Sequence, residues 1–233
     1  MSRNGARKQR RCARGTIEGQ KRQRWRMRPT LMALEDRRLL STFTVTNTAD
    51  SGAGSLRFEI GQANSSVGAN TIDFDSMVFN TALTITLTGG PLELSNTGGT
   101  ETITGPAAGV TVSGGGASRV FQVDGGVTAT FSDLTITKGS TTTNGAGLYN
   151  NGGTVSLTNC TVSSSVNTVG STNGGGLCNN GGTLSLTNCT VAGNSAPSGG
   201  GLSNLAGTTT LTDCTISGNY GTGGGGLDRK SVV

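Results

Sequence analysis

The sequence predicts a parallel β-helix, a coil of short strands in which each turn stacks on the one before it. Four leucines recur at spacings of 29, 25 and 25 residues, and three cysteines each follow one of these leucines by 12 residues. The surrounding segments are near copies, GLYNNGGTVSLTNCTV, GLCNNGGTLSLTNCTV and GLSNLAGTTTLTDCTI. A fixed period in this range is the signature of a repeat architecture. The two columns consist of Leu148, Leu177, Leu202 and Leu227, and of Cys160, Cys189 and Cys214.

Within each repeat, apolar residues alternate with Thr and Ser. In Thr154–Thr158 every second residue is apolar, which is the period of a strand with one buried face. The alternation then slips by one position. A residue in the left-handed conformation would turn the chain there without losing the buried face, and Asn and Asp tolerate this conformation well. The slip falls on Asp133, Asn159, Asn188 and Asp213.

Three short strands, two tight corners and one loop make up each predicted turn. One strand precedes the slip, a second follows it, and a third surrounds each leucine. Successive turns should lie about 4.8 Å apart, with like residues stacked on like. A helical solenoid is excluded because Thr, Ser, Asn and Gly fill the repeat and no apolar stripe of period 3.6 is present. A β-sandwich would need antiparallel hairpins rather than successive near copies.

The pattern continues more loosely upstream. Residues 128–137 align with residues 154–163 without a gap, which places Leu134 in the cysteine column. Before these turns, Ser55 is positioned to cap a helix over Leu56–Asn64. A stacked core exposes its end, so we expect this helix to cover the first turn. The apolar face of the helix should consist of Leu56, Ile60 and Ala63.

Several segments carry a family resemblance: FTVTNTADSGAGSLRFEIGQAN, TIDFD, TITLTGGPLEL, TITGPAAGVTVSGGGASRVFQV and the GGGL and TNCTV copies. Over residues 42–227 the chain resembles the right-handed parallel β-helix repeat proteins of bacterial surfaces, many of them described as autotransporter-like, polymorphic outer-membrane or pectate-lyase-like. The family reads GSLRxAI near its start, and Glu59 departs from it where the family has alanine. The resemblance implies a right-handed coil and an exported protein. The matching residues are Gly54, Ser55, Leu56, Arg57 and Ile60.

Four regions are expected: a basic disordered arm and leader over 1–41, the cap and first turns over 42–100, the repeats over 101–227, and a non-native tail over 228–233. The first 38 residues hold 13 Lys and Arg against 3 Asp and Glu, whereas the rest hold 5 against 10. Such an arm could bind nucleic acid or acidic lipid. It has one aromatic residue and no recognisable nucleic-acid motif, which favours a disordered or targeting segment, so no nucleic-acid partner is expected.

The end of the arm, LMALEDRRLLS, resembles a short leader found before large exported repeat proteins of some environmental bacteria. This resemblance implies an extracellular, cell-surface or outer-membrane location. No secretory apolar region of sufficient length precedes it, and no stretch of the sequence is long enough to span a membrane as a helix. The residues that match the leader are Leu34, Glu35, Arg37, Leu39, Leu40 and Ser41.

The last six residues do not follow the repeat. The pattern predicts a strand after Leu227, but the chain reads DRKSVV. This hexapeptide is what a widely used sequencing adapter encodes before a stop codon. We therefore expect the native protein to be longer than this chain.

The composition excludes several kinds of catalytic site. The chain has no histidine, so Ser-His-Asp and Cys-His catalysis and the usual zinc sites are ruled out. Enzymes of this fold that cleave acidic polysaccharides need clustered carboxylates with Arg or Lys. Residues 139–227 contain one acid, Asp213, and no Lys or Arg, and the acids before them, including Glu93, Glu101 and Asp124, are scattered along the chain. We expect no catalytic residue, no cofactor and no metal site in this chain.

The cysteine column has two interpretations. Neighbouring turns lie within the Cα distance of a disulfide, but the side chains of stacked strands run parallel and Leu134 fills the same column. The preferred interpretation is a ladder of small buried hydrophobic side chains. Cys178, outside this column, aligns with Tyr149 and Ser203. It is expected to face outward as the most reactive thiol.

The outward positions of the clear repeats form a grid of hydroxyl groups. Its spacings should be about 4.8 Å between turns and about 6.6 Å along a strand. A grid of this kind can be a soluble exterior that favours strands, or it can order water or ice, or bind sugars. Its members are Thr154, Ser156, Thr158, Thr183, Ser185, Thr187, Thr208, Thr210 and Thr212.

The function that follows is structural or interactive. We expect the N-terminal part of an exported, surface-associated β-helical protein, a stalk or adhesin-like passenger that contacts glycans or other cell-surface molecules without catalysis in this stretch. An alternative is a polysaccharide lyase or hydrolase whose catalytic turns lie beyond residue 227. A third hypothesis is a binder of ice or glycans that uses the hydroxyl grid.

Overall fold

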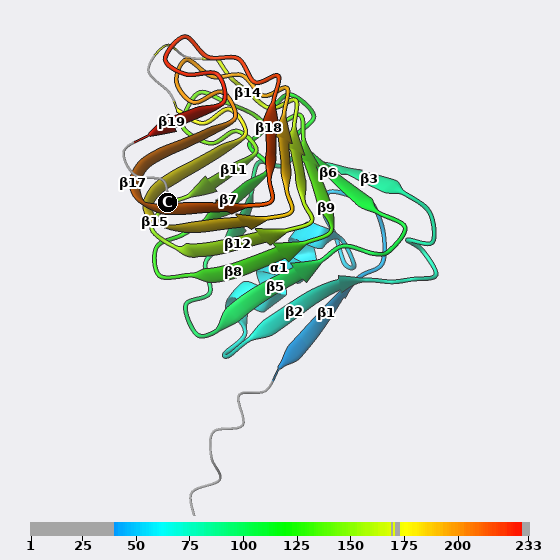
Figure 1. Cartoon of the computed structure of the whole chain (residues 1–233). Helices are drawn as coiled ribbons and strands as arrows, with labels where there is room; N and C mark the ends of the chain where they lie inside the picture. The colour runs from blue at the N-terminus through cyan, green and yellow to red at the C-terminus, as the bar shows by residue number, and fades with distance from the viewer. Residues whose placement is uncertain (1–39, 169, 171–172, 230–233) are drawn as a thin grey trace, which may run out of the picture. The chain divides into compact units, whose positions relative to one another are not determined.

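The structure is a computed structural model that describes residues 40–168, 170 and 173–229. These residues form a parallel β-helix of about six turns with one short helix at its N-terminal end (Figure 1). All strand pairings between the described strands are parallel. The predicted fold class is confirmed, while its right-handed sense stays a prediction. The basic arm, almost all of the leader and residues 230–233 lie outside the described residues.

The turns have three faces. Face 1 is built from β1 (Ser41–Val45), β2 (Asn70–Phe74), β5 (Thr100–Thr104), β8 (Thr128–Ser132), β12 (Thr154–Thr158) and the second halves of β15 (Leu177–Thr187) and β17 (Leu202–Thr212). Face 2 is built from β3 (Leu83–Thr86), β6 (Val110–Ser113), β9 (Leu134–Thr137), β13 (Thr161–Ser163), β16 (Thr190–Ala192) and β18 (Thr215–Ser217). Face 3 is built from β4 (Leu92–Leu94), β7 (Phe121–Val123), β11 (Leu148–Asn150), the first halves of β15 and β17, and β19 (Leu227–Arg229).

The long strands β15 and β17 differ from the prediction of three separate short strands. Each of them runs through the corner between face 3 and face 1, so the two faces are hydrogen-bonded into one sheet of 11 strands. Earlier turns interrupt the strand at this corner, as between β11 and β12. The corner is therefore a bend in a continuous ladder rather than a loop.

The core consists of the side chains that point inward from all three faces. The leucine column lies in register on face 3, since Leu148 pairs with Leu177, Leu177 with Leu202 and Leu202 with Leu227. The first three of these leucines are fully buried, and Leu227 packs partly buried at the last turn. Phe121 and Phe131 meet edge to face, with ring centroids 5.0 Å apart. This packing confirms the column as core.

The corner between face 1 and face 2 adopts the predicted left-handed conformation. The φ angles there are 57° at Asp133, 54° at Asn159, 53° at Asn188 and 52° at Asp213. Side-chain amides join the column, because Asn159 Nδ2 donates to Asp133 Oδ1 and Asn188 Nδ2 to Asn159 Oδ1. Five residues farther on, each turn has a second left-handed position that the sequence analysis missed. It is occupied by Lys138, Ser164, Gly193 and Gly218.

A buried asparagine ladder supports the corner between face 3 and face 1. Asn150 Nδ2 donates to Asn179 Oδ1 at 2.8 Å, and Asn179 Nδ2 donates to Asn204 Oδ1 at 2.8 Å. The same amides donate to the carbonyl groups of Gly153, Gly182 and Gly207. Burying an amide without hydrogen-bond partners costs free energy. The ladder stabilises the corner because each stacked asparagine supplies a hydrogen-bond partner to the next.

Helix α1 (Leu56–Ser65) covers the first turn, as predicted. Ser55 Oγ accepts from Phe58 N and caps the helix, and the residues buried on its inner face are Leu56, Ile60 and Ala63. Arg57 and Asp50 tie this cap to the connection between β3 and β4. The Arg57 guanidinium bonds Asp50 Oδ1 and the carbonyl groups of Gly90 and Pro91, while Asp50 Oδ2 accepts from Thr88 and Gly89.

Candidate functional site

The hydroxyl grid lies on face 1, and it is larger than the sequence analysis predicted. The register pairs Thr154, Ser156 and Thr158 with the equivalent residues of β15, and these with β17. The same register continues backward through β8 and β5, where all outward residues are again Thr or Ser. Three outward positions on each of five strands give fifteen hydroxyl side chains, called here the face 1 array. Its members beyond the predicted nine are Thr100, Thr102, Thr104, Thr128, Thr130 and Ser132.

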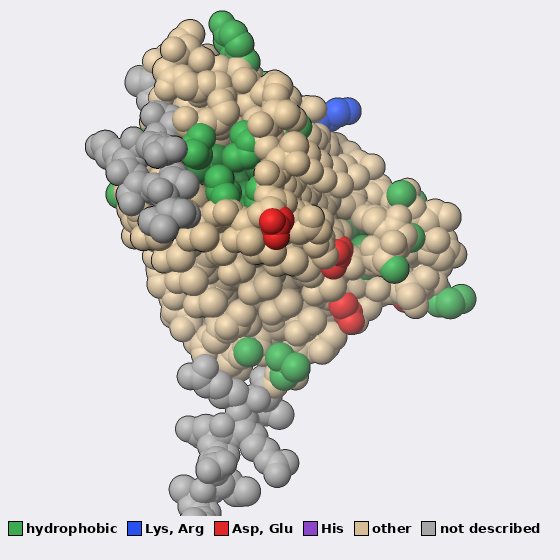
Figure 2. Space-filling view, in the orientation of Figure 1, with side chains coloured by type: hydrophobic (Ala, Val, Ile, Leu, Met, Phe, Trp, Pro, Cys, Tyr) green, Lys and Arg blue, Asp and Glu red, His purple; other side chains and the backbone are tan. Residues whose placement is uncertain are grey.

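The face 1 array is accessible and uncharged. Its side chains are half-buried or exposed, while most residues between them point into the core, as in the pattern of β12, where Val155 and Leu157 are buried. In Figure 2 the surface of this sheet is almost free of hydrophobic and charged side chains. Ser132 Oγ and Thr104 Oγ1 lie 3.3 Å apart and form a hydrogen bond within the array. Its other hydroxyl groups have solvent as an available partner.

Face 2 carries a second set of hydroxyl columns, which the sequence analysis did not assign. The first column is continuous over six strands. The second is less regular, because Ser113 is buried and Ala192 interrupts it. The signal was available in the sequence, since a Thr stands two residues after each slip. The residues of the continuous column are Thr84, Thr111, Thr135, Thr161, Thr190 and Thr215.

The loops between face 2 and face 3 stack on one edge of the coil. Strand β10 (Ser140–Thr141) pairs with β14 (Val166–Asn167), and single bridges continue the stack from Val166 to Ser195 and from Ser195 to Tyr220. These segments run side by side at the edge seen at the top of Figure 1. The loop predicted in each turn is thus partly ordered by the same parallel pairing as the strands.

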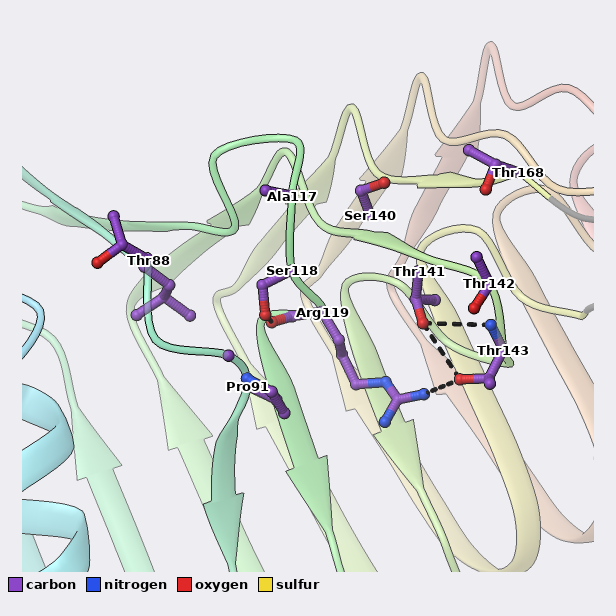
Figure 3. Close-up of a pocket in the computed structure, with 12 residues that line it drawn as sticks. Thr88, Pro91, Ala117, Ser118, Arg119, Ser140, Thr141, Thr142, Thr143 and Thr168 are labelled. Atoms are coloured by element: carbon purple, nitrogen blue, oxygen red, sulfur yellow. Dashed lines mark hydrogen bonds between the residues drawn. The ribbon is translucent and has the colours of Figure 1, made fainter.

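A groove of about 430 Å³ lies beside these loops (Figure 3). Leu87, Pro91 and Ala117 give it a few apolar patches, and Arg119 lies at its wall. Residues from several different turns meet here, which no local sequence pattern shows. The hydroxyl side chains that line it are Thr88, Ser118, Ser140, Thr141, Thr142, Thr143 and Thr168.

Arg119 holds the wall of the groove together. Its guanidinium donates to Thr143 Oγ1, to the carbonyl groups of Asn144 and Gly145, and to Gln122 Oε1 at 2.6 Å. It also lies over the ring of Tyr149, 4.9 Å from the centroid, in a cation–π contact. Burial lowers the pKa of Arg119, and nearby Tyr149 opposes this effect. With these donors engaged, Arg119 positions the loop rather than serving as a base.

Two carboxylates that looked scattered in the sequence come together next to Arg119. Gln122 Nε2 donates to Glu93 Oε1 and to Asp124 Oδ1, each at 3.0 Å. Glu93 and Asp124 are 31 residues apart but belong to adjacent turns of face 3. The amide of Gln122 therefore bridges the two carboxylates. Among the described residues, no group of three or more His, Cys, Asp or Glu side chains is arranged to hold a metal ion.

The cysteine column lies in the core, as the preferred interpretation predicted. Cys160 and Cys189 are buried, Cys214 is partly buried, and all three are free thiols. Their sulfur atoms donate to backbone carbonyl groups, for instance Cys160 Sγ to Thr158 O at 3.3 Å. A hydrogen bond with Cys189 and burial raise the pKa of the Cys160 thiol. The same hydrogen bond with Cys160 lowers the pKa of the Cys189 thiol to about 7, but burial keeps Cys160 and Cys189 away from solvent.

The prediction for Cys178 was wrong. Cys178 aligns with Tyr149 and Ser203, but its side chain is fully buried. Alternation along β15 points the Cys178 side chain away from the core, as predicted, but the edge loop of the same turn covers it. Gly174 in this loop lies so close that a Cβ atom added to it would be 2.8 Å from the Cβ of Cys178. Burial raises the pKa of Cys178 to about 12, and Arg119 offsets only part of that effect. The covering glycine recurs as Gly145, Gly174 and Gly199, three residues before each leucine, but alternation alone does not show that this stretch folds over the outward side of face 3.

Comparison with known proteins assigns no family. The sequence matches none of the protein-family models against which it was scanned. A search of curated proteins also finds no match. Within the part of the chain that the structure describes, no helix is long and apolar enough to cross a membrane.

Proposed function

We propose that the chain is an exported, surface-associated β-helical protein that acts by contact, and that it binds neutral glycans in the groove beside Arg119. The observation that carries the proposal is the lining of this groove, where seven hydroxyl side chains from neighbouring turns surround a space of about 430 Å³. Hydroxyl groups both donate and accept hydrogen bonds, as do the hydroxyl groups of sugars. Pro91 and Ala117 add small apolar surfaces for the carbon–hydrogen faces of a sugar ring.

The charges around the groove favour a neutral ligand over an acidic one. The guanidinium of Arg119 makes its hydrogen bonds with the wall of the groove, and Glu93 and Asp124 lie beside it, whereas Asp50 is neutralised by its ion pair with Arg57. An acidic polysaccharide would meet repulsion from Glu93 and Asp124. A neutral oligosaccharide would exchange hydrogen bonds with water for hydrogen bonds with Thr and Ser, at a small net gain per bond.

The test is binding of the full chain to neutral and acidic oligosaccharides on an array, followed by calorimetry of the ligands that bind. Replacing Thr142 and Thr168 together by Ala should weaken binding roughly thirtyfold, since each lost hydrogen bond contributes about 1 kcal/mol. Ala117→Trp should fill the groove and abolish binding. A matched double substitution on face 2, Thr84→Ala with Thr215→Ala, should leave affinity unchanged. Equal affinity for all variants would refute the groove as the site.

Export rests on the leader resemblance and has its own test. A reporter fused after residue 41 should leave the cytoplasm of the source bacterium if the leader acts as proposed. Replacing Leu39 and Leu40 by Asp should retain the reporter, whereas Arg7→Ala with Lys8→Ala should not. Retention of the unaltered fusion would show that these residues do not direct export.

A further inference from the structure

We propose that the face 1 array binds ice by holding water molecules in a regular layer. The array consists of five in-register strands with a hydroxyl side chain at each of their fifteen outward positions. Its middle column extends two strands farther, through Thr71 and Thr42. The inference does not depend on the glycan groove, which lies beside the opposite edge loops.

The array repeats in two dimensions. Strands in a sheet lie about 4.8 Å apart, and alternate residues along a parallel strand lie about 6.6 Å apart. Backbone ladders on both sides hold β5, β8, β12 and β15 in place, while the array residues of β17 pair with β15 alone. Buried neighbours such as Val155, Leu157 and Leu184 fix the strands from the core side. The hydroxyl groups are therefore ordered before any ligand arrives, which removes most of the entropic cost of binding. The regular surface of ice can match such a lattice of hydroxyl groups, whereas a flexible ligand gains little binding free energy from its regularity.

The chemistry of the array suits water better than sugar. A hydroxyl group donates one hydrogen bond, accepts two and rotates to fit its neighbours, as water does. Twelve of the fifteen residues are threonine, and their methyl groups add apolar surface to the array. No aromatic or charged residue occupies any of the fifteen positions, so the array offers neither a ring for stacking on a sugar nor an ion that would disrupt the water layer.

Face 2 provides the comparison within the same molecule. Its outward positions form only two columns, of which one contains Ala192 and the buried Ser113, and the charged Lys138 follows β9 directly. A lattice with these interruptions offers fewer matched positions. The proposal therefore assigns ice binding to face 1 and not to face 2.

The test is partition of the full chain into slowly growing ice, together with inhibition of ice recrystallisation. The unaltered chain should be enriched in the ice fraction. The triple variant S156K, S185K, T210K should be no more enriched in the ice than a protein without affinity for ice. The matched control carries the same charge on face 2, T135K with T161K and T190K, and should keep the enrichment. Circular dichroism establishes that each variant is folded.

A second, uncharged variant distinguishes loss of ice binding from loss of folding. S156A, S185A and T210V remove three hydroxyl groups at nearly constant volume and without charge, and should lower the enrichment severalfold. Enrichment lost on face 1 and kept on face 2 supports the proposal. Exclusion of the unaltered chain from ice would overturn it, as would equal enrichment of the uncharged variant, or a loss confined to the face 2 variant.

Discussion

Replacing Glu101 by Gln should stabilise the protein at neutral pH and remove most of its pH dependence between pH 5 and 8. Glu101 lies on β5 with its side chain fully buried, and neither carboxyl oxygen has a hydrogen-bond partner. Its neighbour in register, Asn70, is also fully buried, and Asn70 Oδ1 likewise has no partner. Three buried acceptors without a donor fit a protonated Glu101, whose hydroxyl group can serve one of them.

The magnitude follows from the pKa. Burial raises the pKa of Glu101 from 4.5 to about 7. The amide of Asn96 opposes this only in part, because its hydrogen bonds go to the carbonyl groups of Ala63 and Gly68 rather than to Glu101. This rise of about 2.5 corresponds to roughly 3 kcal/mol, at about 1.36 kcal/mol for each pKa unit. The folded chain binds a proton that the unfolded chain has lost, so folding is most favourable near and below pH 4.5. Stability falls as the pH rises from there and levels off above about pH 7.

The assay is urea unfolding followed by circular dichroism at several values from pH 5 to 8. The unaltered chain should lose up to about 3 kcal/mol of unfolding free energy across this range, and the Glu101→Gln chain should lose little. Glu93→Gln removes an exposed carboxylate and serves as the matched control, which should keep the original pH dependence. The reasoning is refuted if the unaltered chain and Glu101→Gln show the same dependence on pH.

Four further predictions concern the cap, the two corners and the covered thiol. Arg57→Ala should cost about 2 kcal/mol in urea unfolding, because it leaves Asp50 without its ion pair and frees the cap from the β3–β4 connection, whereas Arg57→Lys should restore part of the loss. Asn179→Leu should cost roughly 3 kcal/mol, since it leaves buried partners above and below it unsatisfied, and thermal unfolding that matches the unaltered chain would contradict this. Asn159→Ala should cost about 1 kcal/mol through its positive φ, while Asn159→Gly should be near neutral to the backbone. Cys178 should react with a maleimide only at the rate of unfolding, and rapid labelling of the native chain at this residue, mapped by mass spectrometry, would show that the edge loops do not cover it.

Much of the fold was predictable because it repeats. The slip in the alternation identified Asp133, Asn159, Asn188 and Asp213 as left-handed corners, and all four have positive φ. The hydroxyl grid was predicted on nine positions and found on fifteen. The ungapped alignment of residues 128–137 already implied the positions on β8, while only the register showed that β5 continues the columns. The asparagine ladder was missed, although Asn150, Asn179 and Asn204 recur in the same position of each repeat. Alternation places these residues inward, two positions after each leucine, but buried positions are mostly apolar, and only the structure shows the amides bonded between turns.

The sequence by itself determined the period, the corners, the cap and the outward positions of the strands, since each of these depends on local chemistry repeated at fixed spacing. Only the tertiary structure decided which distant residues meet. It brought Glu93 and Asp124 together as acceptors of the Gln122 amide and buried Glu101 beside Asn70. It also covered Cys178 with loops and assembled the groove beside Arg119. These contacts join different turns through loops of unequal length, and a segment without a period carries no local signal of where it packs.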